Sequence, residues 1–298
     1  MNMAVLGTGK ANGAISILHA AGTGYGCSLP VDLPVMVKLL DAPSKRELND
    51  PDELLTSVLD AWESKNLPLP KDRDSLHWAV ASRVPPRQGL KSSSAISIAA
   101  IKALIQATEQ ELDDYTIIEI ASQAQINSGV SITGSIDDSW ACLTDGWKLI
   151  DANSQSIQEG VIMEGPSLDP EEWTVLILKR QERKQRPTLE DFIPYYDEFE
   201  KSLISIQQGD LLNCLTLNGR VICGVVGDIA GRKHVNDSFL YGARAAGMTG
   251  SGPAIVIFVP SLVRSATEKM TKMFSNKPDI KEVVEVKLLR SETTDSEN

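Results

Sequence analysis

The sequence predicts a globular fold in which strands and helices are mixed along the whole chain. Hydrophobic residues make up 42% and charged residues 23% of its 298 positions, the composition of a soluble protein with a full core. From Val31 to Leu39 apolar side chains alternate with polar ones or proline, as in a strand with one buried face. From Leu54 to Trp62 they follow helical spacing instead. The length allows one large domain or two of ordinary size.

The charge balance and the cysteines restrict the partners and the compartment. The net charge is −11, which argues against a nucleic-acid partner and means that local donors must hold any anionic substrate. No apolar run approaches the roughly 20 residues of a membrane helix, and the N-terminus lacks a signal-peptide pattern. The four cysteines form no C-x-x-C pair, so we expect reduced thiols in the core. These features predict a cytoplasmic protein without a membrane partner.

The most informative stretch is Pro-Pro-Arg-Gln-Gly-Leu-Lys-Ser-Ser-Ser-Ala at residues 85–95, which an apolar run with helical spacing follows. The prolines end a predicted strand at residues 76–80, and Gly89 allows a sharp turn. The serines stand where a helix N-cap belongs. Unpaired amides, the helix dipole and the charge of Lys91 would suit a polyphosphate. An ordinary capped helix after a polar loop is the alternative interpretation.

The remaining N-terminal half continues with helices and a hairpin. Residues 112–129 read as a helix that Gly129 ends. Asp137 and Asp138 are expected in a loop after it, where they fit either turn formers or a site with repelling charges. Asp145-Gly146 predicts a type I′ hairpin over residues 143–150. A linker is expected between Asp151 and Trp173.

The C-terminal half is predicted to hold a second set of strands and helices. Strands are expected at residues 173–178, 254–258 and 283–289, and helices at 189–208, 236–247 and 260–274. The basic run at residues 179–186 fits a solvated loop. It also fits a mobile lid that meets ATP phosphates or a substrate carboxylate.

Four strings carry a family resemblance. The string at residues 85–95 resembles the phosphate loop of the GHMP small-molecule kinases, and Lys91 with the additional serine looks like their archaeal shikimate kinase branch. Gly9-Lys10-Ala11 resembles the first GHMP motif, and Gly-x-Thr-Gly-Ser-Gly-Pro at 247–253 resembles the third. Thr-Gly-x-x-Asp-Asp at 133–138 resembles a motif of the archaeal shikimate kinases. A Walker loop and a complete dinucleotide fingerprint are both lacking.

The resemblance implies the α+β, two-domain GHMP kinase fold. Residues 1–160 would form a domain like domain 2 of ribosomal protein S5, and residues 161–298 a ferredoxin-like domain. ATP would lie between them, with its phosphates over the helix that begins near Ser93. The implied reaction is phosphorylation of the 3-hydroxyl of shikimate, a step of chorismate and aromatic amino acid biosynthesis, with ATP and Mg²⁺ as cofactors.

The resemblance also assigns site residues. Asp137 would be the catalytic acid, and Lys10 would hold it as its anion. The phosphate-binding residues would be Pro86, Gly89, Leu90, Lys91, Ser92, Ser93, Ser94 and Ala95, with Ser94 also on the metal. The substrate-binding residues would be Asp32, Thr133, Gly134, Asp138, Thr249, Gly250, Ser251 and Gly252. Lys10 and Asp32 fit equally well as a solvated turn lysine and a strand-surface acid.

Several alternatives remain open at this point. A GHMP kinase for homoserine or for an isoprenoid alcohol such as mevalonate would share the phosphate loop, and a nucleotide-binding regulator would lack turnover. Several GHMP kinases supply a glutamate to Mg²⁺ from the helix before the aspartates. Residues 123–127 contain none, and Glu119 lies further back. The oligomeric state and the arginine that meets the substrate carboxylate (Arg83, Arg87, Arg220 or Arg244) are not assigned.

Overall fold

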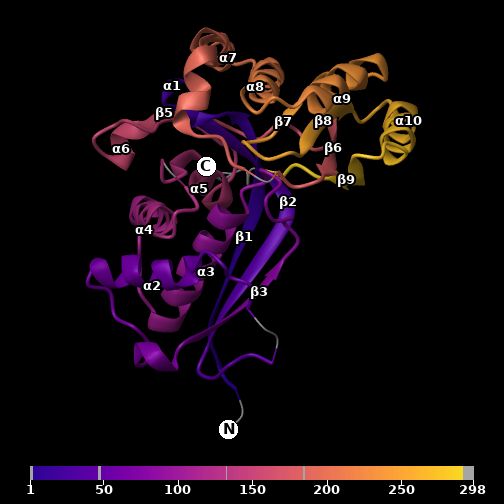
Figure 1. Cartoon of the computed structure of the whole chain (residues 1–298). Helices are drawn as coiled ribbons and strands as arrows, with labels where there is room; N and C mark the ends of the chain where they lie inside the picture. The colour runs from indigo at the N-terminus through magenta and orange to yellow at the C-terminus, as the bar shows by residue number, and fades with distance from the viewer. Residues whose placement is uncertain (1–2, 46–47, 132, 184, 291–298) are drawn as a thin grey trace, which may run out of the picture.

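The first sheet of the protein is a long antiparallel sheet that carries the N-terminal half (Figure 1). The computed structural model describes residues 3–45, 48–131, 133–183 and 185–290. The strands are β1 (Val5–Leu18), β2 (Tyr25–Leu40), β3 (His77–Ser82), β4 (Trp147–Asp151) and β5 (Val161–Gly165). Their order is β1-β2-β4-β5, and β3 also pairs with β2. The start of β2 pairs with β4 and its end with β3, so β2 links the two ends of the sheet.

Helices cover one face of this sheet, at the left of Figure 1. They are α2 (Leu54–Ser64), α3 (Ser92–Thr108), α4 (Asp114–Asn127) and α5 (Ile136–Leu143). The helix α3 lies directly on β1. The two approach so closely that a Cβ atom at Gly9 would come within 1.9 Å of the carbonyl oxygen of Ala99. This close packing fixes the position of the first turn of α3 relative to the sheet.

The second sheet carries the C-terminal half, which runs from pink through orange to yellow in Figure 1. Its strands are β6 (Trp173–Arg180), β7 (Ala245–Met248), β8 (Ile255–Pro260) and β9 (Ile280–Val286), in the order β7-β8-β6-β9. The helices of this half are η2 (Leu189–Tyr195), α7 (Tyr196–Gln207), α8 (Leu211–Val225), α9 (Ile229–Leu240) and α10 (Arg264–Ser275). The short elements α1 (Ala20–Thr23), η1 (Arg73–Ser75) and α6 (Ile157–Gly160) complete the described structure.

One hydrophobic core crosses from the first sheet into the second. It includes Ile15 and Leu29 of the first sheet and Val175 and Phe258 of the second. A smaller core lies among the second sheet and helices α8 to α10. The shared core holds the two halves together, so a cavity between them has rigid walls.

Two expected elements are wrong, and one helix was not expected. The hairpin at residues 143–150 is wrong, because Ile136–Leu143 forms α5 and only the following strand β4 exists. Trp140 and Ala141 are buried, and helical spacing lets both face the core. The helix at 236–247 ends at Leu240, since Gly242 turns with φ 102° into β7. The helix α8 was not predicted.

The change of sheet lies after the predicted boundary at residue 160. Strand β5 still pairs with β4 of the first sheet, and β6 begins the second sheet at Trp173. The expected linker therefore corresponds to residues 166–172. In the described part of the chain, no helix combines the length and the apolar character needed to cross a membrane.

Candidate active site

A cavity of about 980 Å³ lies where the two halves meet. Its walls come from the phosphate loop, from the start of α5, from residues 182–183 and 185–192 after β6 and from the glycine-rich loop after β7. Segments from both ends of the chain therefore contribute to one site. The lining residues used below are Ser16, His19, Arg87, Gly89, Lys91, Ser92, Ser93, Thr133, Asp137, Asp138, Arg183, Arg186, Phe192, Gly250, Ser251 and Gly252.

The phosphate loop opens the first turn of α3 toward this cavity. Lys91 is the N-cap residue in a left-handed conformation, and its side chain makes no capping hydrogen bond. The first amide of the helix with an internal acceptor is that of Ala95, which donates to Lys91 O at 3.0 Å. The amides of the three preceding serines are therefore free to bind an anion. Ser92 and Ser93 line the cavity.

Ser94 points elsewhere. Its side chain is buried, and its Oγ donates to Gln125 Oε1 at 2.9 Å. Gln125 Nε2 in turn donates to Ser139 Oγ at 3.0 Å. The predicted metal ligand is thus engaged in a buried hydrogen-bond chain in this structure.

The glycine-rich loop after β7 packs directly against the phosphate loop. Thr249 Oγ1 donates to Gly89 O and accepts from the amide of Ser16, both at 2.9 Å. A Cβ atom at Gly252 would lie 2.1 Å from the amide nitrogen of Gly89. Only glycine allows this approach. Of the substrate residues predicted in this loop, Gly250, Ser251 and Gly252 line the cavity, whereas Thr249 is buried behind it.

Asp137 and Asp138 lie in the first turn of α5, not in a loop. Ser28 Oγ donates to Asp138 Oδ1 at 2.8 Å and lies 3.5 Å from Asp137 Oδ2. Lys91 Nζ is 2.7 Å from Asp138 Oδ1. Gly26 makes room for the pair, since a Cβ atom there would lie 2.5 Å from Asp137 Cγ. Both carboxylates also benefit from the N-terminal end of the helix.

The two aspartates share one lysine unequally. Burial and the nearby charge of Asp138 raise the pKa of Asp137 to about 8, against a smaller lowering by Lys91. Burial would also raise the pKa of Asp138, but the charge and hydrogen bond of Lys91 hold it below its usual value. For Lys91, burial acts to lower the pKa, and the two aspartates outweigh it and raise it. Asp138 and Lys91 are therefore the ion pair, and Asp137 holds a proton in a pH range where most carboxyls have lost it.

The expected contact between Lys10 and Asp137 is wrong. Lys10 is exposed on β1 opposite Met36. It lies six residues before Ser16, which lines the cavity, and six residues span about 20 Å along a strand. Lys91 occupies the place beside the aspartates instead. Asp32 is exposed on β2, where its amide donates to Lys287 O, and it does not line the cavity.

The loop at residues 133–135, directly before α5, lies only partly at the cavity. Thr133 lines it. Gly134 has φ 80° and lies against Ser122, where a Cβ atom would be 2.1 Å from Oγ. Its role is to let the backbone turn into α5 rather than to contact a ligand.

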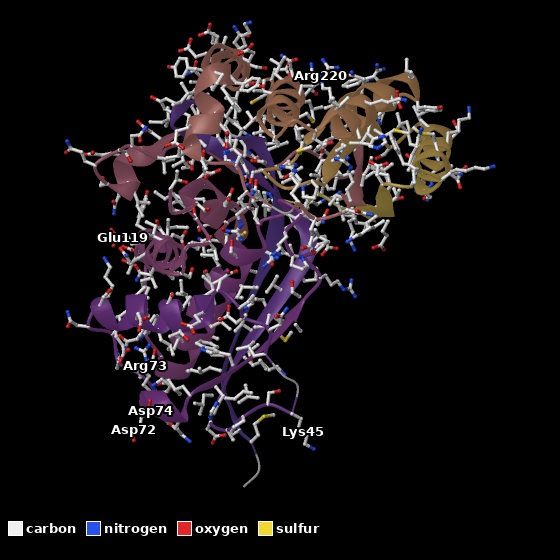
Figure 2. All side chains as sticks on the ribbon, in the orientation of Figure 1. Lys45, Asp72, Arg73, Asp74, Glu119 and Arg220 are labelled. Carbon is white, nitrogen blue, oxygen red and sulfur yellow. The ribbon has the colours of Figure 1, made fainter. Side chains whose placement is uncertain are left out.

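Metal ligands can come from the cavity but not from the outer face of α4. Glu119 forms an ion pair with Lys65 on that face (Figure 2). No cluster of three or more His, Cys, Asp or Glu side chains able to hold a metal occurs among the residues with a described structure. The cavity still offers the carboxylates of Asp137 and Asp138 and the hydroxyl of Ser93. Mg²⁺ binds through one or two carboxylates together with substrate phosphates, so this donor set fits it.

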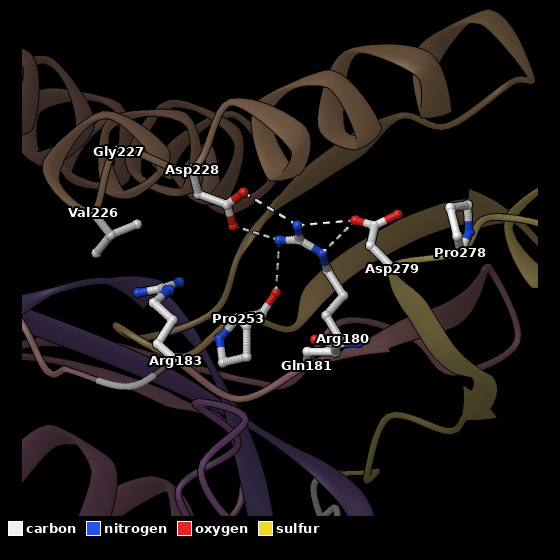
Figure 3. Close-up of a pocket in the computed structure, with 9 residues that line it drawn as sticks. All are labelled: Arg180, Gln181, Arg183, Val226, Gly227, Asp228, Pro253, Pro278 and Asp279. Atoms are coloured by element: carbon white, nitrogen blue, oxygen red, sulfur yellow. Dashed lines mark hydrogen bonds and ion pairs between the residues drawn. The ribbon is translucent and has the colours of Figure 1, made fainter.

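The basic run at 179–186 is more than a solvated loop. Arg180 is buried and pairs with Asp228 and Asp279 (Figure 3). These residues line a second cavity of about 500 Å³ behind the glycine-rich loop. His234 Nε2 lies 2.8 Å from Asp279 Oδ2 and completes the network.

Arg180 also connects to the phosphate loop through its backbone. The Gln88 side chain donates to Arg180 O at 2.9 Å and accepts from Arg180 N at 3.1 Å. Arg183 donates to the carbonyl oxygens of Ser251 and Gly252. Both loops of the site are thus tied to the segment after β6. These contacts were not predicted, because nothing local in the sequence distinguishes Gln88 or Arg183 from other polar loop residues.

Of the four arginines considered for a substrate carboxylate, Arg87 lines the cavity. Arg220 lies on α8 at the far side (Figure 2), with its guanidinium over the ring of Phe239. Arg83 and Arg244 are exposed and outside the cavity lining. Arg186, which donates to Val130 O at 3.4 Å, is a further cation of the cavity.

Residues 54–146 match the family model described as GHMP kinases N terminal domain. The chain is 27% identical to a shikimate kinase of Pyrococcus abyssi, with 83% of this chain and 89% of that protein covered. It is 25% identical to a shikimate kinase of Methanothermobacter thermautotrophicus, with 85% and 87% covered.

Solved structures share the fold. A crystal structure of mevalonate kinase matches with a TM-score of 0.71 and 15% identity, covering 95% of this chain and 99% of that one. A Lactococcus lactis galactokinase complexed with galactose matches with a TM-score of 0.70 and 9% identity, covering 96% and 94%. These likenesses confirm the expected α+β fold.

Proposed function

We propose that this chain, which belongs to the GHMP kinases, transfers the γ-phosphoryl group of ATP to the 3-hydroxyl of shikimate and so forms shikimate 3-phosphate. The observation that carries the proposal is that one cavity contains both the open first turn of α3 and the Asp137–Asp138 pair on Lys91. An anion site beside a buried carboxylate of raised pKa is what a kinase for small hydroxylated substrates needs.

Shikimate is the substrate that the sequence comparisons favour. Relatives described as shikimate kinases align over most of this chain. The cavity also suits a hydroxylated carboxylate, because Arg87 and Arg186 stand on its wall together with Thr133. Four free and buried cysteines agree with a cytoplasmic enzyme.

The phosphates of ATP bind over the first turn of α3. The amides of Ser92–Ser94 donate to phosphate oxygens, and the Ser93 hydroxyl adds a further donor. Thr249 and Gly252 hold Gly89 in place, so the loop is shaped before the nucleotide arrives. Pre-formed donors of this kind stabilise the charge that spreads over the transferred group.

Asp137 accepts the proton of the substrate hydroxyl. Its carboxyl loses its own proton near pH 8, which is close to the range in which a general base works best. Lys91 fixes Asp138, and Ser28 bridges the two carboxylates, so the geometry of Asp137 is held by a neighbour that stays charged. Ser93 and Asp138, together with the phosphates, would hold Mg²⁺, and the ion would neutralise phosphate charge.

The test is a substrate panel with purified protein. Shikimate, homoserine, mevalonate and galactose are each incubated with ATP and Mg²⁺, and ADP formation is measured. We expect kcat/KM for shikimate to exceed that for the other three by at least a hundredfold. Faster turnover of homoserine or mevalonate would assign the protein to another GHMP activity. ATP binding without turnover of any acceptor would identify a nucleotide-binding regulator.

A further inference from the structure

His19 stands in the cavity, yet the proposed chemistry does not use it. It follows the last residue of β1 and caps the short helix α1. Its Nδ1 accepts from the amide of Ala21 at 3.2 Å, and its own amide donates to Asn218 Oδ1 at 3.0 Å. The ring packs against Phe192, with centroids 4.9 Å apart. The backbone hydrogen bond to Asn218, the cap of α1 and the ring of Phe192 therefore fix the position of the His19 ring.

These contacts select one form of the ring. Because Nδ1 accepts a hydrogen bond from an amide, it carries no proton, and the proton of the neutral ring is on Nε2. In a protonated ring, Nδ1 would carry an N–H group that faces the backbone N–H group of Ala21. Burial agrees with this, since it lowers the pKa of His19 to about 4, with a further lowering by the charge of Lys91.

The Nε2–H group is left for a ligand. Within the described ranges, no side chain or backbone atom pairs with Nε2. His19 lines the same cavity as Asp137 and Lys91, and its ring lies against the apolar ring of Phe192. A rigid neutral donor beside an apolar ring is suited to an uncharged oxygen such as a hydroxyl.

We propose that His19 is a specificity-determining residue whose Nε2–H donates to the hydroxyl next to the one that is phosphorylated. The proposal rests on the proposed function. In shikimate the reacting 3-hydroxyl has one hydroxylated neighbour, at C4, because its other ring neighbour belongs to the double bond. A phosphoryl acceptor without this second hydroxyl would cover the Nε2–H donor and leave it unpaired, and such sites discriminate strongly.

Two variants separate the cavity donor from the helix cap. His19→Asn keeps an acceptor for the Ala21 amide, since asparagine is a good N-cap, but its short side chain removes the donor from the cavity. His19→Gln is long enough to present an N–H group at the place of Nε2, but it gives up the cap. If His19 serves only as a helix cap, His19→Gln should lose more kcat/KM than His19→Asn. If His19 binds the substrate, His19→Asn should lose more.

The experiment measures kcat/KM for shikimate, 4-deoxyshikimate and 5-deoxyshikimate, together with the melting temperature of each variant. For His19→Asn we expect an unchanged melting temperature and a roughly five- to twentyfold loss with shikimate and with the 5-deoxy compound. With 4-deoxyshikimate, the variant and the wild type should be equal. His19→Gln should melt earlier and keep most of its kcat/KM for shikimate.

Either of two results overturns the inference alone. One is an equal loss for His19→Asn with all three substrates, and the other is a larger loss in His19→Gln than in His19→Asn. If the wild type does not phosphorylate shikimate, the proposed function fails, and this inference fails with it. The wild-type measurement thus tests the function, and the variant ratios test His19.

Discussion

Two networks of carboxylates stand on either side of the glycine-rich loop, and they differ in how many side-chain donors the carboxylates share. Behind the loop, Asp228 and Asp279 both bond to Arg180, and Asp279 also meets His234. In the cavity, Lys91 is the one cation that pairs with Asp137 and Asp138 among the residues that the structure describes. We call these the arginine network and the lysine network.

The pKa values of the carboxyls follow this difference. In the arginine network burial acts to raise the pKa of Asp228 and of Asp279, but hydrogen bonds outweigh it. Arg180 and the amide of Gly231 lower the pKa of Asp228, and His234 and Arg180 lower that of Asp279. In the lysine network Asp138 takes the lysine, and the pKa of Asp137 rises to about 8. A satisfied network holds loops in place, whereas an unsatisfied carboxyl can exchange a proton.

The largest expected effect is the loss of the base in the lysine network. Asparagine is nearly isosteric with aspartate but cannot accept the proton, so Asp137→Asn should lose roughly 10²–10⁴-fold in kcat. MgATP binding, measured by calorimetry, should survive. The matched control Asp138→Asn should be milder, unless Asp138 holds Mg²⁺, in which case its defect should shrink as Mg²⁺ is raised. Near-normal turnover of Asp137→Asn would refute the role of Asp137 as base.

The arginine network should matter for stability more than for chemistry. Arg180→Met leaves the partly buried carboxylates of Asp228 and Asp279 without their main partner, which should lower the free energy of unfolding by about 1.5–3 kcal/mol. Urea titration measures this loss. At a temperature where the variant is folded, kcat should stay within about tenfold of the wild type, because Gln88 bonds to the backbone of Arg180. A loss of turnover without a loss of stability would contradict the comparison.

The phosphate loop offers a smaller and more local test. Ser93→Ala removes one hydroxyl of the cavity and keeps the amides, so kcat/KM for MgATP should fall by the value of one charge-assisted hydrogen bond, ~1.5–3 kcal/mol. Ser94→Ala should act mainly on stability, since Ser94 bonds to the buried Gln125. If Ser94→Ala impairs MgATP use more than Ser93→Ala does, Ser94 is the metal ligand after all. Unchanged kinetics in both variants would show that the serines at the start of α3 form a plain helix cap.

The last expected effect concerns pH. Since Asp137 is protonated below about pH 8 in the free protein, kcat/KM for shikimate should fall by up to about tenfold for each pH unit below 8. Asp137 also binds a proton on folding between pH 4 and 8, so its contribution to stability is complete below pH 4 and is lost as the pH rises through 8. Asp137→Asn should therefore gain stability over the wild type as the pH rises. Parallel stability curves from pH 5 to 9 would contradict the raised pKa.

The sequence by itself determined the features that depend on short stretches of chain. The phosphate loop, the glycine-rich loop and the identity of the paired aspartates could be read from local strings, because turns, caps and close backbone approach have local chemistry. The alternation in β2 and the helical spacing of α2 and α3 were predicted for the same reason. The prediction of secondary structure failed where the short helix α5 was taken for a loop before a hairpin, and where Gly242 ended a helix early.

Only the tertiary structure decided which of these residues meet. The contacts Thr249–Gly89 and Arg180–Gln88 join residues 160 and 92 positions apart, and Lys91 rather than Lys10 reaches the aspartates. No local pattern encodes such pairs, because they arise when two sheets pack through a common core. The proton on Asp137 has the same origin: its raised pKa depends on burial and on losing Lys91 to its neighbour, and both follow from packing.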